Sequence, residues 1–154
     1  MTKWLSKDQQ VHWRSWITTS NVLPELLSRE LQEEFGLTIT DYEILVRLSE
    51  APNKQMRMSE LAQKTLLSRS RLSHQIDRLE DRGLVNRRSC EQDRRGQNCI
   101  MTNKGWDTLV AAAPIHVSGV RKHFVDQLTD AEYEALGKAL AKVATHLDEQ
   151  IENS

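Results

Sequence analysis

The chain has 154 residues, about the length of one domain, with 21 Lys and Arg against 22 Asp and Glu and a formal net charge of −1. It lacks the run of roughly 20 apolar residues that a membrane-spanning helix needs, and no apolar run follows the first charged residues as in a secretory signal. Two cysteines are too few for a disulfide-stapled secreted domain. These features exclude a membrane protein, a disulfide mini-protein and a disordered tail, and they predict a cytoplasmic protein.

The charge is concentrated in the middle of the chain. Residues 57–104 contain eleven basic and six acidic residues, a net charge of +5, while the rest of the chain carries −6. A basic centre between acidic flanks indicates that one part of the molecule meets a polyanion. Charge alone leaves open the alternative of a solvated basic face.

The N-terminal third predicts two helices. Apolar residues recur at three- and four-residue spacing over residues 13–35, which predicts a helix that starts near Ser6 or Asp8 and ends at Gly36. Pro24 interrupts this stripe and predicts a kink or two abutting helices. The run Thr40-Asp41-Tyr42-Glu43 matches a capping box and predicts a second helix that continues to about residue 50.

The middle of the chain predicts two more helices and a hairpin. After a loop at residues 51–54, Ser59 is expected to cap a short helix over residues 60–65. The next helix runs from about Arg69 to Arg82. Two short strands follow, with a charged loop between them. The expected strands span residues 84–90 and 97–102.

The C-terminal third is predicted to be helical. A long helix follows Thr102, and Pro114 should bend it. Its expected apolar face comprises Trp106, Leu109, Val110, Ala113, Val117, Val120 and Phe124. The run from Thr129 to Glu132 is a second capping box and begins the last helix. The apolar seam of that helix, close to a heptad pattern, comprises Tyr133, Leu136, Leu140, Val143, Leu147 and Ile151.

Two short helices joined by a tight turn and followed by a basic hairpin have the order of a winged helix-turn-helix. The predicted fold is therefore mainly α with a small β-hairpin wing, flanked by helices at both ends. When the apolar positions of residues 69–82 face the core, the acidic side chains fall only in the C-terminal half of this helix. Because phosphate repels carboxylates, we expect the N-terminal half to enter the major groove; an ordinary solvated helix is the alternative. The predicted DNA contacts here are Ser68, Arg69, Ser70, Arg71, Ser73 and His74, with Arg78 on the DNA backbone.

The hairpin tip fits the same interpretation. Arg94 and Arg95 precede Gly96, which allows a tight turn, and an arginine on such a tip can enter a narrow minor groove. Asp93 could hold the guanidinium of Arg95 in a fixed orientation. The alternative is a surface ion pair without function.

These residues resemble the MarR family of transcriptional regulators. The resemblance rests on Ser59-Glu60-Leu61-Ala62, on the runs 67–73 and 76–80, and on Gly83-Leu84-Val85. Asp93-Arg94-Arg95, followed by Met101-Thr102-Asn103-Lys104-Gly105, is similar to the wing motif of that family, with Met where Leu is usual. The resemblance covers nearly the whole chain.

The resemblance implies an obligate, triangular homodimer that binds a palindromic operator on double-stranded DNA, most often as a repressor. Residues 1–36 and 103–154 would form a helical dimerisation region, and residues 37–102 the DNA-binding lobe of one intertwined domain. The last helix's seam and the tryptophans of the first favour dimerisation independently, although they could also pack within one chain. Two recognition helices would enter major grooves about 10 bp apart.

Family members often respond to small, frequently aromatic or phenolic ligands held between the dimerisation helices and the DNA-binding lobe. The candidate effector residues are Trp16 and Tyr42, with His12 and His116 as polar partners. His12 and Trp16 are four residues apart and therefore share one helical face. Trp13 could line the same cleft, but a place in the core or at a dimer interface explains Trp16 equally well and Trp13 better. Binding of the ligand would release the operator.

A redox switch is a second possible form of regulation. Cys90 and Cys99 both fall on the predicted hairpin, and a disulfide across it would lock or distort the wing. Strand register is not fixed by the sequence, and cytosolic thiols are usually reduced.

Other chemistry finds little support in the sequence. No pair of the five histidines has the HxxxH spacing, and no set of cysteines and histidines matches a zinc site, so we expect no metal and no cofactor. No phosphate loop or nucleophile motif is present, and we expect no enzyme activity. Two further alternatives are a non-specific architectural DNA-binding protein and a winged helix used for protein contacts.

Overall fold

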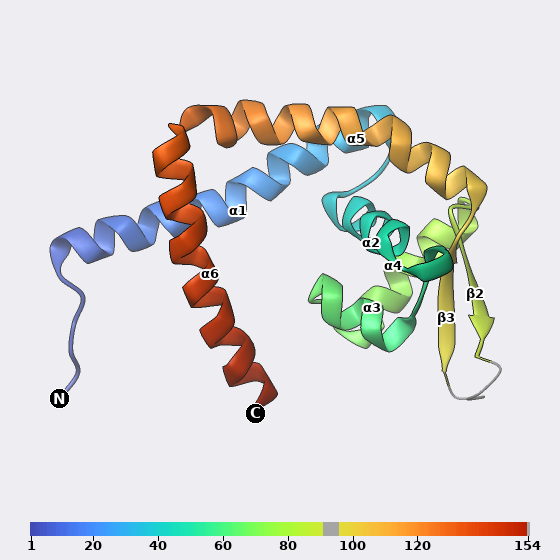
Figure 1. Cartoon of the computed structure of the whole chain (residues 1–154), viewed down its shortest axis with the longest axis horizontal. Coiled ribbons are helices and arrows are strands. Elements are labelled where there is room, and N and C mark those ends of the chain that lie inside the picture. Colours follow the sequence, from blue (N-terminus) through green and yellow to red (C-terminus); the bar gives the residue numbers. More distant parts are fainter. Residues whose placement is uncertain (91–95, 154) are drawn as a thin grey trace. The chain divides into compact units, whose positions relative to one another are not determined.

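The computed structural model describes residues 1–90 and 96–153. The chain divides into two compact units, Met1–Val117 and Ser118–Ser154. Among the described residues, no helix is both long and apolar enough to cross a membrane. Figure 1 shows the elements in chain order.

The first unit contains the winged helix-turn-helix. Its helices are α1 (Lys7–Phe35), α2 (Ile39–Glu50), α3 (Met58–Thr65), α4 (Arg69–Asp81) and the first part of α5 (Asn103–His123). A 3-10 turn spans Pro52–Lys54, and the strands are β1 (Gln55–Arg57), β2 (Val85–Ser89) and β3 (Gln97–Met101). This arrangement confirms the predicted fold class.

The three strands form one antiparallel sheet in the order β1-β3-β2. The strand β1 was not predicted, because residues 51–54 were expected to be a loop that leads directly into a helix. The register places Met56 and Arg87 opposite Cys99, on the face that packs on the core. Since neighbouring side chains alternate between faces, Arg57, Asn98 and Arg88 form a row across the other face.

The core lies between α2, α3, α4 and the inner face of the sheet. Its fully buried side chains include three residues of α4 at the predicted positions, with no more than 1% of their surface exposed. They are Leu72, Ile76 and Leu79. The end of α1 adds Leu27 and Leu31, whereas the first half of α1 has no buried residue. The core therefore fixes α4 from behind and leaves its other face to solvent.

Two helix starts differ from the prediction. Thr38, not Thr40, caps α2: its hydroxyl accepts from the amide of Asp41 at 3.1 Å, and Asp41 accepts from the amide of Thr38 at 2.9 Å. Ser59 lies inside α3, which begins at Met58 without a side-chain cap. Helix α1 begins at Lys7 with Ser6 as its cap, within the predicted start, and Gly36 ends it as predicted, with a φ of 62°. Neither error changes which helices form.

The two prolines do not divide their helices. Helix α1 runs through Pro24, so two abutting helices were a wrong expectation, and α5 runs through Pro114. In the first unit α5 buries Leu109, as predicted, but it buries Ala112 where the prediction had Ala113. Three of the predicted apolar residues are exposed instead: Trp106, Val110 and Val117.

Helix α5 starts very close to the sheet. A Cβ on Gly105 would lie 2.1 Å from the carbonyl oxygen of Leu84, so this position has no room for a side chain. Nearby, the ammonium of Lys54 lies 3.8 Å from the centre of the Trp106 ring, which holds the turn before β1 against α5.

The second unit contains the end of α5, a 3-10 turn at Val125–Gln127 and α6 (Asp130–Glu152). The predicted capping box is present, because Thr129 and Glu132 exchange hydrogen bonds at 3.2 and 2.8 Å. The rings of Phe124 and Tyr133 meet edge to face at 6.1 Å. No described residue of α6 is buried.

Candidate nucleic-acid interface

The start of α4 presents a polar, positively charged surface. Ser68 caps the helix by accepting a hydrogen bond from the amide of Arg71 at 3.2 Å. The side chains predicted to contact DNA here are exposed, with Ser73 partly buried. They are Ser68, Arg69, Ser70, Arg71 and His74. No acid lies in the first turn, so the positive end of the helix dipole and two guanidinium groups face solvent together.

The acidic half of α4 is turned toward the wing. Arg87 on β2 donates to Asp77 and Glu80, the latter at 3.2 Å, and to the Ser73 hydroxyl at 3.4 Å. Burial opposes the charge of Arg87, but the hydrogen bonds to both carboxylates outweigh it and raise the Arg87 pKa. The carboxylates are therefore partly neutralised, and β2 is fixed to α4.

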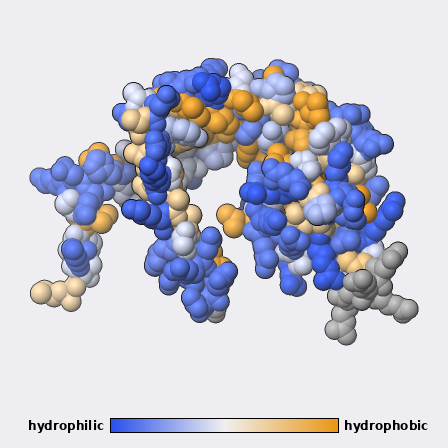
Figure 2. All heavy atoms as spheres, in the orientation of Figure 1, coloured by the Kyte–Doolittle hydropathy of each residue, from blue (hydrophilic) through white to orange (hydrophobic). Residues whose placement is uncertain are grey.

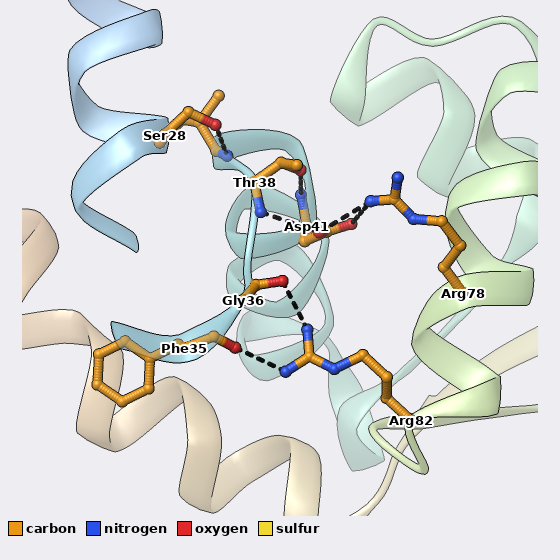
Figure 3. A network of polar contacts seen from close by, with 8 residues as sticks. Ser28, Phe35, Gly36, Thr38, Asp41, Arg78 and Arg82 are labelled. Carbon is orange, nitrogen blue, oxygen red and sulfur yellow. Dashed lines mark hydrogen bonds and ion pairs between the residues drawn. The ribbon is translucent and has the colours of Figure 1, made fainter. Parts of the chain in front are cut away.

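Arg78 contacts the helix behind it. Its guanidinium donates to both carboxylate oxygens of Asp41, at 3.1 and 3.3 Å, as Figure 3 shows. Asp41 is only 2% exposed, whereas 57% of the Arg78 side chain remains exposed. Sequence reasoning assigned Arg78 to the DNA backbone but could not foresee a partner 37 residues away.

Arg82, at the end of α4, contacts the end of α1. Its guanidinium donates to the carbonyl oxygens of Phe35 and Gly36 at 2.6 and 2.8 Å (Figure 3). These carbonyls lie at the negative end of the α1 dipole, where a cation is favoured. The sequence singled out neither this role of Arg82 nor that of Asp41.

The wing tip lies outside the described residues. Arg94 and Arg95, both predicted to enter the minor groove, belong to the segment 91–95. The outer face of the sheet is described, and it forms a groove of about 730 Å³ lined by Arg57, Arg88 and Asn98 among others. Sequence reasoning missed this row because it depends on β1. Figure 2 shows hydrophilic side chains over much of the visible surface of the part of the first unit that contains α2, α3, α4 and the sheet.

The two cysteines do not face each other. In the β2–β3 register Cys99 lies opposite Arg87, so Cys90 points to the other face of the hairpin. Cys99 is fully buried, and burial raises its pKa to about 12. The thiol of Cys90 lies 3.3 Å from Oδ1 of Asn98. A disulfide between the two cysteines is therefore not compatible with this register, and the predicted redox alternative is not favoured.

Two of the four candidate effector residues lie together. The rings of Tyr42 and His116 are 4.3 Å apart, and Nδ1 of His116 is buried with no hydrogen-bond partner among the described residues. Burial raises the pKa of Tyr42 and lowers that of His116. Trp16 is 43% exposed on the first half of α1, and His12 lies one turn before it, also exposed.

Within residues 1–90 and 96–153, no group of three or more His, Cys, Asp or Glu side chains is arranged to hold a metal ion. The polar clusters of the lobe instead pair acidic with basic side chains, as in the contacts of Arg78 and Arg87.

The family and the known proteins that this chain resembles are described as transcriptional regulators. The MarR family model matches residues 37–96. The chain is similar to AbsC, a MarR family transcriptional regulator from Streptomyces coelicolor, with 47% identity, a TM-score of 0.90, and coverage of 96% of this chain and 99% of that one. A second MarR family transcriptional regulator from the same organism, crystallised in complex with DNA, is 40% identical, with a TM-score of 0.92 and coverage of 96% and 92%. An uncharacterised HTH-type transcriptional regulator from Bacillus cereus is 28% identical over 125 residues, 80% of this chain and 81% of that protein.

Proposed function

The chain belongs to the MarR family of transcriptional regulators, and we propose that it is a repressor that binds a palindromic operator as a homodimer and leaves it when a small ligand binds. The observation that carries this proposal is the start of α4, where exposed guanidinium, hydroxyl and imidazole groups surround a helix N-terminus without acids. Such donors suit base edges and phosphates in the major groove.

The wing supplies the second part of the proposed interface. Arg94 and Arg95 at its tip would enter the minor groove, where negative potential attracts arginine. The outer sheet face, with Arg57 and Arg88 on the strands that flank β3, adds positive charge for backbone phosphates. Arg78 stays a predicted phosphate contact, because more than half of its side chain is exposed while it donates to Asp41.

Dimerisation is supported by apolar side chains that the single chain leaves exposed. On α1 they include Trp13, Trp16 and Ile17, and on α6 they include Val143, Leu147 and Ile151, all between 37% and 69% exposed. Exposed apolar surface on this scale is typical of an interface. We therefore assign residues 1–36 and 103–154 to the dimerisation region and residues 37–102 to the DNA-binding lobe.

The ligand would be a small aromatic molecule. The Tyr42–His116 pair brings two aromatic rings together, and Nδ1 of His116 is buried without a hydrogen-bond partner among the described residues. An aromatic ligand with a hydroxyl group would pack beside these rings and give that nitrogen a partner. His12 and Trp16 are the other proposed contacts.

The test begins with duplexes that the purified protein selects from a random double-stranded pool. We expect binding that resists scrambled competitor and weakens steeply with salt. Arg71→Ala should weaken binding to the selected duplex by about tenfold or more, because a good base contact is worth roughly 1–3 kcal/mol. Arg47→Ala, which removes the same charge from α2, outside both the proposed DNA contacts and the proposed dimerisation region, is the control.

Three other outcomes would contradict the proposal in different ways. Binding without sequence preference would indicate an architectural protein. No binding of any duplex at low salt would indicate a winged helix for protein contacts. Equal losses for Arg71→Ala and Arg47→Ala would show that α4 does not read bases.

A further inference from the structure

Three helices meet at one corner of the first unit. The amide of Ile39, at the start of α2, donates to the Ser28 hydroxyl of α1 at 2.8 Å, which fixes the angle between these two helices (Figure 3). The C-terminal half of α4 then contacts both of them. We call the Asp41–Arg78 ion pair and the two hydrogen bonds of Arg82 the corner clamp.

Asp41 holds α2 and α4 through one buried carboxylate. It accepts from the amide of Thr38 at the start of its own helix and from the guanidinium of Arg78. Because a buried charge is costly without its partners, neither contact is easily given up. The carboxylate therefore fixes one point of α4 against the N-terminus of α2.

Arg82 holds α4 to α1. Its planar fork donates to the last two carbonyls of the α1 terminus, at Phe35 and Gly36. A guanidinium can satisfy two acceptors at a set angle, which an ammonium cannot. Since Arg78 and Arg82 are four residues apart, the clamp has two points on one face of α4 and resists both rotation and tilt.

The clamp lies at the far end of α4 from the proposed base contacts, and one of its members, Arg78, is also the proposed phosphate contact. At about 1.5 Å of rise per residue, Ser70 is roughly 18 Å along the helix from Arg82, so a tilt of about 10° at the clamp moves Ser70 by about 3 Å. That displacement is close to the ~3.4 Å between successive base pairs. A small change of angle at the clamp therefore displaces the start of α4 by about the distance between successive base pairs.

We propose that Asp41 and Arg82 are positioning residues that set the number of base pairs between the two half-sites the protein accepts. The inference rests on the proposed function, in which α1 belongs to the dimerisation region. A fixed angle between α1 and α4 then fixes the separation of the two recognition helices. Neither residue needs to touch DNA.

The test measures spacing preference rather than affinity alone. Duplexes carry the half-sites selected by the wild-type protein, with one or two base pairs added or removed between them. The readout is the ratio of the Kd on an altered spacing to the Kd on the selected spacing. A residue that only stabilises the fold changes both values together and leaves this ratio unchanged.

We expect the wild-type ratio to be about tenfold or more for one base pair, because such a change also rotates one half-site around the duplex. Asp41→Asn and Arg82→Gln should reduce the ratio to about threefold, and Arg82→Lys, which can reach one carbonyl, should give a value between. Arg47→Gln is the matched control: it breaks the 2.8 Å pair with Glu43 inside α2 and should keep the wild-type ratio. Circular dichroism establishes that each variant is folded.

Variants that keep the wild-type ratio, at any absolute affinity, would overturn the clamp and leave the proposed function standing. A wild-type protein that selects no sequence would overturn the proposed function and the clamp's role in spacing together. If Asp41→Asn does not fold, the two Arg82 variants decide the question.

Discussion

His116 illustrates how one side chain ties stability to pH. Its ring stacks on Tyr42, and burial lowers its pKa from the ordinary value while Glu43 opposes the shift. The folded protein therefore binds fewer protons at this site than the unfolded chain as pH falls below about 6.5. Stability from this group is present above that pH and is lost on acidification.

Replacing His116 by Phe should make the loss of stability between about pH 7.5 and 5.5 shallower, since the stack remains and the titration is removed. Urea unfolding at several pH values would measure this slope. An unchanged slope would show that His116 is not the group that couples folding to protons in this range.

At single positions, the sequence predicted the type of contact, such as a helix cap, better than it predicted which residue makes the contact. Thr38 and Thr40 both match a capping pattern, and the local run favours neither. Asp41 decides between them, because its carboxylate also serves Arg78, 37 residues away. The exposed residues at the start of α4 follow from helical periodicity alone, so they were predictable.

Arg87 joins strand β2 to helix α4. Arg87→Gln should lower the free energy of unfolding by about 1–3 kcal/mol, because two partly buried carboxylates, Asp77 and Glu80, lose their cation. The neighbouring change Arg88→Gln removes the same charge from the exposed face and should stay within about 0.5 kcal/mol. Urea unfolding of both variants makes the comparison, and equal losses would contradict a specific role for Arg87.

Elements were predicted well where their signal is local. The apolar spacing of Leu72, Ile76 and Leu79 was enough to orient α4. The strand β1 escaped prediction because it has three residues, runs directly into α3 and pairs with a strand some 40 residues later. The opposite faces of Cys90 and Cys99 required the register, which no local pattern supplies.

For the whole molecule, the proposed dimer predicts a dependence on α6. Leu147→Glu should weaken dimerisation by about a hundredfold or more. A two-fold dimer contains one Leu147 from each subunit, and burial of each leucine contributes roughly 1.5–3 kcal/mol to the free energy of association. Thr145→Glu adds the same charge on the opposite side of α6 and is the control. Sedimentation equilibrium measures the dimer, and operator binding should fall with it. A stable Leu147→Glu dimer would place the interface elsewhere.

The overall architecture could be predicted from the order of the elements. The sequence did not predict which apolar face of each long helix packs against the core. On α5 the structure buries Ala112, whereas the sequence favoured Ala113. A long helix with apolar residues on more than one side offers several faces, and partners distant in sequence choose among them.

The absence of buried residues on α6, among those described, bears on how the protein is maintained in a cell. If the proposed dimer forms through α6, a subunit without a partner presents a long apolar helix face to chaperones and proteases, and a paired subunit hides it. Turnover would then remove unpaired chains faster than paired ones. The supply of regulator would follow successful pairing rather than the rate of synthesis, and surplus or mismatched chains would be cleared before they could occupy a single half-site.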